Sequence, residues 1–400
     1  GYASLSADTL GSRSTALGYA ALHVQNFTSA TDTYNTAVGF HAGYQISTGL
    51  QNTIVGGLAG GALTDADENV AVGISALSTD TKGSRAVAIG AGALFTQNFT
   101  TATNGYNVAV GYHAGNDITT GVQNTLIGGL AGDAMTDAAR NTAVGYASLS
   151  TATSSDNSAI GWGALIIAST GNANTAVGRS ALGSNTTGGS NVAVGYLAAD
   201  AVSTGNNNVA IGAGTLSANT VGDRNVAIGS QALAVYNPAS NEDSYNVAIG
   251  HDAGAAVTTG SENTLIGGQA GDALDVGATN VAVGKGAIGS DTKGSRAVAV
   301  GTGALSAQNF TSATDNYNVA VGYVAGSAIN TGAHNTPLGG LAGDSITTGN
   351  RNTVVGHNVA TSLQDGSDNV AIGDSVNVAA SLGNSITIGS GISATGSNDF

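Results

Sequence analysis

A five-residue motif that ends in glycine recurs along the whole chain at a nearly constant spacing. It reads Asn-Thr-Ala-Val-Gly at residues 35–39, Asn-Val-Ala-Val-Gly at 107–111 and Asn-Val-Ala-Ile-Gly at 225–229. Most motif glycines recur with a period of 17, as at Gly39, Gly56 and Gly73, whereas four intervals are 21 and two are 16. A short fixed period indicates a solenoid, because each repeat buries its apolar face only by stacking on its neighbours. We therefore expect residues 1–400 to form one continuous all-β solenoid of about 23 short coils.

The residues before each motif glycine have the pattern of a short β-strand. In the 22 complete motifs, the residue directly before the glycine is always Val, Ile or Leu, and the second residue before it is Ala in 16. This alternation favours an extended strand that is apolar on both faces. One face is expected to line the narrow interior of the coil, and the other to need a partner. The glycine is expected to adopt a conformation closed to other residues, or to allow close approach of the next coil.

The segment after the glycine predicts a second short strand. A segment such as Ile-Ser-Ala-Leu at 74–77 places another Ala toward the interior, and a Thr-Gly turn often follows it. In four motifs a bulky residue replaces the Ala, with an extra glycine three residues later: Ile54 with Gly57, Leu126 with Gly129, Leu265 with Gly268 and Pro337 with Gly340. This pairing predicts that the bulky side chain and the extra glycine compete for the same space in a close-packed interior.

Asparagine opens 18 of the 22 motifs, and the exceptions are Ser14, Ala86, Ala297 and Ser385. Stacked coils place equivalent side chains about 4.8 Å apart, so this column predicts a ladder of amide hydrogen bonds. The ladder residues include Asn35, Asn52, Asn69, Asn107, Asn124, Asn141, Asn174, Asn191, Asn208 and Asn225. This structural role is favoured over a row of ligand-binding amides.

Four coils, at 19–39, 91–111, 230–250 and 302–322, are longer than the others. These long coils carry aromatic insertions and end in Tyr just before the next motif. Loops on a rigid scaffold often carry recognition. The candidate receptor-binding residues are Phe27, Tyr34, Phe99, Tyr106, Tyr236, Tyr245, Phe310 and Tyr317 in these coils, and Trp162 elsewhere. For the three Phe residues we favour the alternative that they fold back on their own loop or pack on a neighbouring subunit.

The position directly after the motif glycine varies freely and is expected to face solvent. It holds Tyr19, Phe40, Tyr112 and Trp162, but also Arg179 and several Gly. Exposed rings there could stack on sugars, although shielding of the backbone at a corner is slightly favoured.

Composition argues against several classes of protein. The chain has 25 acidic and 10 basic residues and a net charge of −15, without a basic cluster, so we expect no nucleic-acid partner. The sequence contains no run of 18 apolar residues, which argues against membrane insertion. It lacks Cys, and its six His are spread over six different coils, so no metal and no cofactor are expected. The usual catalytic motifs are missing, which predicts that the protein is not an enzyme.

Some of the repeats resemble those of known fibrous proteins. Asn-Val-Ala-Ile-Gly at 208–212 and 369–373 and Ser-Ile-Thr-Ile-Gly at 385–389 resemble the head repeats of YadA-type trimeric autotransporter adhesins. The text Asn-Thr-Ala-Val-Gly-Tyr at 141–146 is similar to repeats in bacteriophage tail fibres. The resemblance covers essentially the whole chain. It implies a left-handed parallel β-roll and a side-by-side homotrimer, displayed outside a virion or cell to bind a surface glycan or protein receptor.

The coil length separates the two attachment hypotheses. Adhesin head coils are shorter than the coils of this chain, so the resemblance favours the shaft of an extracellular bacteriophage tail fibre. The alternative is the head of an adhesin on a bacterial cell surface. Gly1 would close a coil whose first half is missing, which predicts a segment of a longer fibre. An ice-binding solenoid and a polysaccharide-cleaving enzyme are disfavoured, because a persistent Thr-x-Thr face and paired acids are missing.

Overall fold

A computed structural model describes residues 1–168 and 170–396 of the chain. The chain divides into two compact units, Gly1–Asn191 (unit 1) and Val192–Phe400 (unit 2). Each unit is a parallel β-solenoid whose paired strands keep the motif period, as where Thr36 pairs with Thr53, and the chain has about 23 coils in all. None of the described residues forms a helix. The predicted all-β solenoid is confirmed, and its handedness and the homotrimer stay predictions.

The strands are short, and most contain three residues. In unit 1 they are β1 (Gly11–Ser12), β2 (Thr15–Leu17), β3 (Thr31–Asp32), β4 (Thr36–Val38), β5 (Thr53–Val55), β6 (Val70–Val72), β7 (Gly83–Ser84), β8 (Val87–Ile89), β9 (Thr103–Asn104), β10 (Val108–Val110), β11 (Thr125–Ile127), β12 (Thr142–Val144), β13 (Ser158–Ile160) and β14 (Thr175–Val177).

Unit 2 continues the same pattern. Its strands are β15 (Val192–Val194), β16 (Val209–Ile211), β17 (Val226–Ile228), β18 (Val247–Ile249), β19 (Thr264–Ile266), β20 (Val281–Val283), β21 (Gly294–Ser295), β22 (Val298–Val300), β23 (Thr314–Asp315), β24 (Val319–Val321), β25 (Thr336–Leu338), β26 (Thr353–Val355), β27 (Val370–Asp374), β28 (Asn377–Val378), β29 (Ile386–Ser390) and β30 (Ser393–Ala394).

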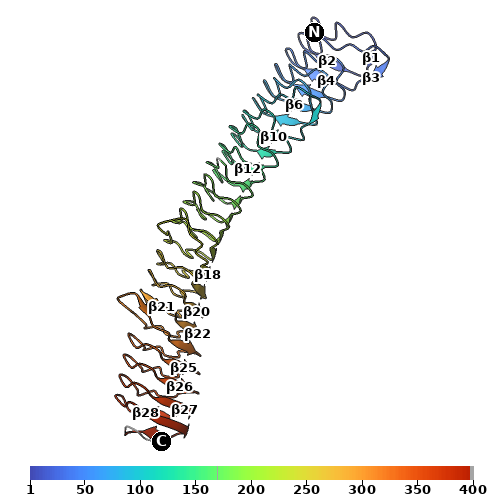
Figure 1. The fold of residues 1–400 in the computed structure, drawn as a ribbon. Helices are drawn as coiled ribbons and strands as arrows, with labels where there is room; N and C mark the ends of the chain where they lie inside the picture. The colour runs from blue at the N-terminus through green and yellow to red at the C-terminus, as the bar shows by residue number, and fades with distance from the viewer. Residues whose placement is uncertain (169, 397–400) are drawn as a thin grey trace. The chain divides into compact units, whose positions relative to one another are not determined.

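Equivalent motif residues lie directly above one another in each unit. Ala37 of β4 pairs with Ile54 of β5, and Ile54 pairs with Ala71 of β6, all in parallel register. Figure 1 shows such strands on successive coils, for example β25, β26 and β27 in unit 2. The central residue of every three-residue strand except β2 faces the interior and is buried, whereas the flanking residues in most coils keep part of their surface exposed. This is the two-faced strand predicted from the motif.

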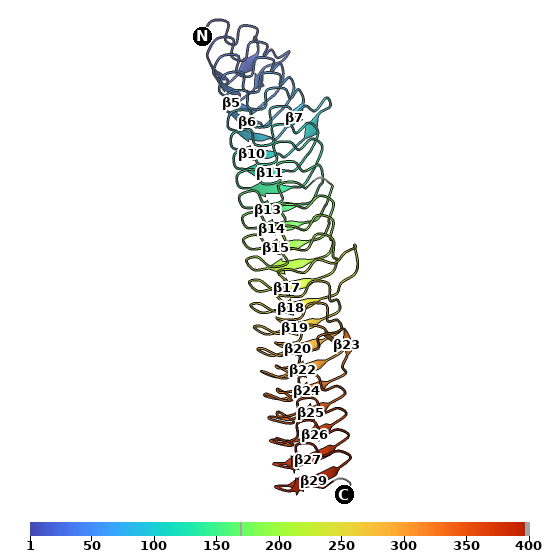
Figure 2. The same cartoon turned by 90° about the vertical axis from the view of Figure 1, so that its left-hand side faces the viewer.

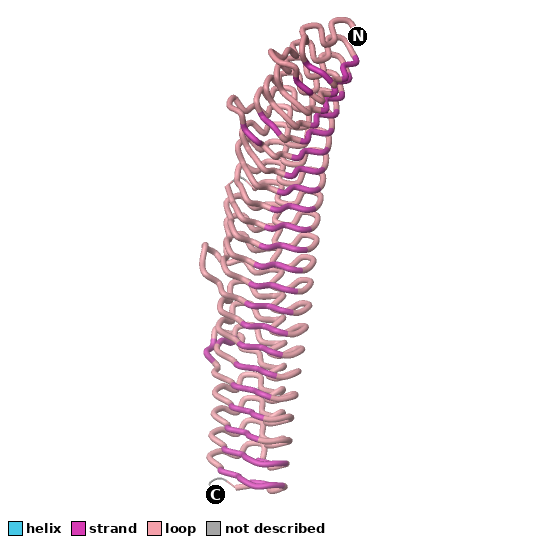
Figure 3. Tube along the Cα trace, turned by 90° about the vertical axis from the view of Figure 1, so that its right-hand side faces the viewer, coloured by secondary structure: helices cyan, strands magenta, loops and turns pink. Residues whose placement is uncertain are grey.

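The long coils add small paired strands away from the main column of strands. In unit 1, β1 pairs with β3 and β7 pairs with β9, and in unit 2, β21 pairs with β23. Figure 2 shows a loop projecting from unit 1 beside β7 and the loop with β23 projecting from unit 2. In Figure 3 these pieces lie on the opposite side of the coils from the main strands. The inserted residues of these long coils therefore pair with the backbone of the preceding coil.

The predicted second strand is wrong for most coils; the exceptions are β28 and β30, which pair with each other in unit 2. Residues 74–77 form a series of tight turns in which Ser75 and Leu77 have φ angles of 56° and 51°. Hydrogen bonds between coils hold this left-handed backbone, because the N–H of Ser75 donates to Gly57 O (2.9 Å) and the N–H of Leu77 to Ala93 O (2.9 Å). The prediction that Ala76 faces the interior is confirmed, since it is fully buried.

Both expectations for the motif glycine are confirmed. Gly56 has a φ of 136°, and a Cβ added there would lie 2.4 Å from Gly73 O on the next coil. The other motif glycines from Gly18 to Gly373 have φ angles of 127–145°. A side chain is thus excluded both by its own backbone conformation and by the coil stacked against it.

The predicted competition between bulky motif residues and the following extra glycine is wrong. A Cβ on Gly57 would have nothing within 4 Å, because this residue faces outward. The glycine that makes room is Gly60, where a Cβ would lie 2.9 Å from Ile54 Cδ1. Leu126 has the same relation to Gly132 and to Gly115, where a Cβ would lie 2.9 and 2.7 Å from its methyl carbons. Interior volume is therefore conserved between the motif centre and the fourth residue after the motif glycine.

The adjacent glycines Gly56 and Gly57 provide a matched test of coil stacking. Gly56→Ala is expected to lower the free energy of unfolding by about 1–3 kcal/mol or more, because it forces a disfavoured backbone angle and a clash with the next coil. Gly57→Ala is expected to leave stability unchanged, because its methyl group meets open space. Thermal unfolding of the full chain, followed by circular dichroism, measures both. Equal melting temperatures for the two variants would contradict the stacking model.

Candidate functional site

The asparagine column lies inside the coils and joins each coil to the next. Asn35 Oδ1 accepts the backbone N–H of Asn52 (2.9 Å), and Asn52 Nδ2 donates to Asn35 Oδ1 (3.2 Å) and to Ala66 O (2.8 Å). Similar bonds recur at Asn69, Asn124, Asn141, Asn174, Asn191 and Asn225. These side chains are essentially buried, so the column supports the backbone and presents no amide row to a ligand.

A buried polar network replaces the asparagine ladder where a long coil begins. Ala86 has no side-chain amide, and the Gln97 side chain takes over by accepting from Asn107 Nδ2 (2.8 Å). Gln97 Nε2 donates to Asp80 (2.6 Å), which also accepts the backbone N–H groups of Gly83 and Phe99 at 3.0 Å each. Burial raises the pKa of Asp80, and these donated hydrogen bonds oppose the rise. Asp8–Gln25–Asn35 and Asp291–Gln308–Asn318 repeat the arrangement.

The Phe residues of the long coils fold back under their own loops. Phe27, Phe99 and Phe310 are buried, and a Cβ on Gly83 would lie 2.7 Å from the Phe99 ring. In the remaining long coil, 230–250, Tyr236 is fully buried. The prediction that these four residues offer rings to a receptor is therefore wrong for this chain, whereas the alternative of loop packing agrees with the structure.

The tyrosines that end the long coils are about half exposed and paired with arginine. Arg85 donates to the Tyr106 hydroxyl (2.8 Å), lies over its ring at 5.7 Å from the centroid, and forms an ion pair with Glu68 (3.0 Å). Equivalent pairs are Arg13–Tyr34, Arg224–Tyr245 and Arg296–Tyr317. Exposed ion pairs contribute little stability, so each cluster mainly fixes the orientation of its ring.

Rings at the position after the motif glycine stack along unit 1. Tyr2, Tyr19 and Phe40 form one run, with ring centroids 5.6 and 5.5 Å apart. Trp162 stacks on Tyr146 at 6.5 Å, and Arg179 lies over its other side at 5.3 Å. All these rings are substantially exposed. The column is thus solvent-facing, as the sequence predicts.

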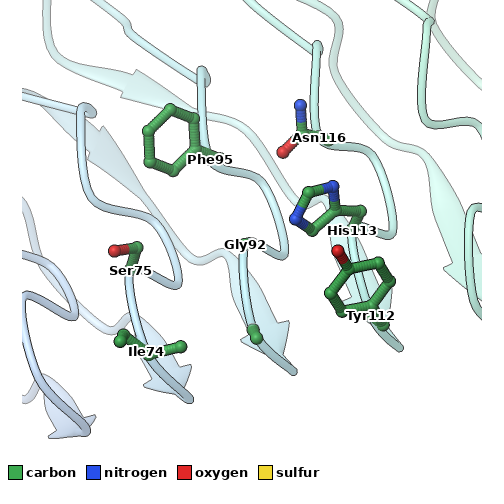
Figure 4. Close-up of a pocket in the computed structure, with 8 residues that line it drawn as sticks. Ile74, Ser75, Gly92, Phe95, Tyr112, His113 and Asn116 are labelled. Carbon is green, nitrogen blue, oxygen red and sulfur yellow. The ribbon is translucent and has the colours of Figure 1, made fainter.

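Unit 1 contains an open hollow of about 450 Å³ where small residues interrupt this surface. Its base is Ala91 and Gly92, with Ile74 and Ser75 on the preceding coil and Tyr112 and His113 on the following coil. Figure 4 shows Gly92 between these two pairs, with Phe95 and Asn116 completing the rim. A side chain at Gly92 would clash with one wall of the hollow, because its Cβ would lie 2.7 Å from the His113 ring.

A second hollow of about 510 Å³ adjoins the first. It extends past Gly61 and Ala62 to His41 and Tyr44, and the two hollows share Ser75 and Phe95. Together they form the unit 1 groove, which crosses the coils between His41 and Asn116. Since equivalent positions stack, the groove follows the direction in which the coils are stacked.

The groove offers aromatic faces and uncharged polar groups. The rings of Tyr112 and His113 stack with centroids 4.1 Å apart, and Tyr112 is 59% exposed. Asn116 Nδ2 donates to Asp117 (2.6 Å), and its Oδ1 is turned toward Gly92. Among the described residues that line the two hollows, none is Asp, Glu, Lys or Arg. The groove can therefore stack against and hydrogen-bond to a ligand, without ion pairing to side chains of those four types.

None of the nine aromatic candidates predicted from the sequence lines either hollow. Tyr34, Tyr106, Tyr245, Tyr317 and Trp162 lie on the surface outside them. Sequence reasoning missed the groove because it depends on missing side chains, at Gly61, Ala91 and Gly92. A usable signal was the contrast between these small residues and bulky ones at equivalent positions of neighbouring coils.

Comparison with known proteins gives no family: no family model matches the chain, and no curated protein matches it. Within residues 1–168 and 170–396, no group of three or more His, Cys, Asp or Glu side chains is arranged to hold a metal ion. The same residues contain no helix with the length and apolar character needed to cross a membrane. Function is therefore inferred from the repeats and the surface.

The Asp80 network predicts that an isosteric substitution is harmful. In Asp80→Asn, an amide donor replaces the oxygen that accepts from Gln97. Rotating the Gln97 amide would only move the clash between donors to Asn107. We expect a loss of about 1–3 kcal/mol in the free energy of unfolding, measured by thermal denaturation of the full chain.

A second substitution supplies the control for this test. In Asp80→Asn/Gln97→Glu, the new carboxylate accepts from both amides, so much of the lost stability is expected to return. Asp65→Asn, at an exposed turn, should have little effect. Full stability of Asp80→Asn, or no recovery in the double variant, would contradict the assigned hydrogen bonds.

Proposed function

We propose that this chain is part of the shaft of a trimeric attachment fibre, of the kind found in bacteriophage tails. The role is structural and adhesive, needs no catalysis or cofactor, and places the chain outside the cell, on a virion. The main support is an apolar surface on the outer face of the motif strands, which a side-by-side partner would cover. The resemblance of the motifs to tail-fibre repeats supports the same assignment.

The apolar outer face runs from coil to coil in each unit. In unit 1 it includes Ile89, Ile127 and Ile160, and in unit 2 it includes Ile211 and Val321, all 37–43% exposed. Each pairs through its strand with Val, Ile or Leu on neighbouring coils. A continuous exposed apolar surface of this kind is typical of interaction sites. Three chains packed on these faces would bury it, as the homotrimer hypothesis requires.

A trimer would also suit attachment through weak contacts. Each chain would present the same surface, so three modest contacts act together and gain affinity through multivalency.

The head of a bacterial trimeric adhesin would use the same surface and stays the alternative, favoured by the Asn-Val-Ala-Ile-Gly motifs. The longer coil of this chain favours the tail fibre, and the sequences that flank the segment in its gene would separate the two.

The homotrimer is tested by charged substitutions on the outer strand face. We expect the unmodified protein to have three times the chain mass of 38.5 kDa by light scattering after size-exclusion chromatography. Ile127→Lys/Ile160→Lys combined with Ile211→Lys/Val321→Lys should release monomers, because buried unpaired charges are costly. Val276→Lys, which changes an exposed apolar residue outside the strands, should stay trimeric. A stable wild-type monomer at micromolar concentration would refute the proposal.

Attachment is tested with the same proteins on intact bacteria. Fluorescently labelled wild-type protein is expected to bind the surface of host cells. The monomeric variant should bind about 10²–10⁴ times more weakly, because multivalency is lost. Flow cytometry over a concentration series measures both. Equal binding by the trimer and the monomeric variant would contradict multivalent attachment, and absence of binding to any cell tested would contradict the attachment role.

A further inference from the structure

We propose that the unit 1 groove binds a neutral oligosaccharide, with Phe95 and Tyr112 as stacking surfaces and Ser75, His113 and Asn116 as hydrogen-bonding groups. The inference deepens the proposed attachment function and rests on it, because it names the chemical class of receptor. It concerns residues other than the aromatic loops singled out by the sequence.

The shape of the groove fits an elongated ligand. The two hollows lie side by side, share Ser75 and Phe95, and stay open to solvent. A compact ligand would occupy one hollow only, whereas a chain of several units can lie along both. Phe95, at the junction, would contact the middle of such a chain.

The side chains match the two kinds of surface that a sugar ring presents. The face of an aromatic ring carries partial negative charge, so it attracts the weakly positive C–H groups on one face of a pyranose. Phe95 and Tyr112 expose 37% and 59% of their surface, which leaves their rings accessible. Asn116 Oδ1, the Ser75 hydroxyl and the His113 ring can bond to sugar hydroxyl groups. Aromatic faces with a few polar groups are common in ligand sites.

Charge narrows the ligand to a neutral one. No Lys or Arg lines the described hollows, and the chain has a net charge of −15. Polyanions such as nucleic acids require cationic side chains to neutralise their phosphates. An acidic polysaccharide would be repelled for the same reason. Sugars without carboxylate, sulfate or phosphate groups meet no such barrier.

Backbone pairing disfavours an extended peptide. Peptides often bind by adding a strand to unpaired backbone groups at a sheet edge. In the groove these groups are already used between coils: Gly92 N–H donates to Ile74 O and His113 N–H donates to Ala91 O, both at 3.0 Å. Recognition must therefore come from side chains, which suits a ligand that presents ring faces and hydroxyl groups.

Part of the chain that forms the groove is repeated in unit 2, and this copy has the same type of motif with different groove residues. Residues 80–121 recur at 291–332 with 31 of 42 residues identical, including the motif at 107–111 and the Asp–Gln–Asn network. The groove positions differ, since Ser306, Val324 and Ser327 stand where unit 1 has Phe95, His113 and Asn116. The same scaffold thus accommodates both sets of side chains, and the residues of the copy can be placed in unit 1 without disturbing the fold.

The experiment compares the wild-type protein with Phe95→Ser/His113→Val/Asn116→Ser. Each is titrated calorimetrically with the neutral hexasaccharides of glucose (α-1,4 and β-1,4), mannose, xylose and N-acetylglucosamine, and with a hexagalacturonate as the anionic probe. We expect at least one neutral probe to bind, and the triple variant to bind it at least about tenfold more weakly, the loss typical of removing a stacking ring. Tyr323→Ser removes the ring equivalent to Tyr112 in the second copy and should bind normally.

Three results would overturn the inference. The first is that none of the neutral probes binds, or that the triple variant binds them as well as the wild type. The second is preferential binding of hexagalacturonate or of a gelatin peptide assayed alongside. The third is a change in molecular mass on light scattering for the triple variant, which would show that the groove packs against another copy. Wild-type protein that attaches to cells but binds no sugar would refute the saccharide and leave the attachment role standing.

Discussion

Hydrogen bonding between successive coils determines most of this structure. Thr36 N–H donates to Asn52 O, and Gly39 N–H donates to Leu17 O, both at 2.8 Å. Coils can come this close only where a motif glycine leaves its Cβ position empty, as at Gly39, whose Cβ would stand 2.5 Å from Gly56 O. The interior that results is narrow, so Ala fills most motif centres, and the bulky Ile54, Leu126, Leu265 and Pro337 each have a glycine opposite. Outward positions are free of these limits and can vary.

The sequence predicts the regular features well because the same physical reason is repeated in every coil. The period, the strand before each glycine and the buried Ala all follow from alternation and spacing. The second segment is misjudged, because Ile-Ser-Ala-Leu at 74–77 looks locally like a strand. Its left-handed residues Ser75 and Leu77 are held by bonds to neighbouring coils, and no local propensity reports such contacts.

The candidate site is harder to predict for a related reason. Aromatic residues in long loops are conspicuous in the sequence, yet Phe99 is buried by its own loop. At Ser14, Ala86 and Ala297 the missing Asn coincides with a Gln that takes over its place in the interior, and only the structure shows this exchange. The groove is defined by what Gly61 and Gly92 lack, in a sequence where glycine otherwise marks turns. The groove can be recognised only from the structure, because residues of several neighbouring coils form its walls.

The repeated register has a consequence for how such a chain can change. Every coil presents similar hydrogen-bonding groups to the coils on either side, so whole coils can be duplicated or lost without altering the contacts of those that remain. The copies at 80–121 and 291–332 look like the product of one such duplication, with a common interior and divergent outer side chains. Duplication of coils changes the length of the protein, whereas substitution of outward-facing residues changes its surface chemistry. The two kinds of change are independent, because the backbone hydrogen bonds between coils do not involve the outward-facing side chains.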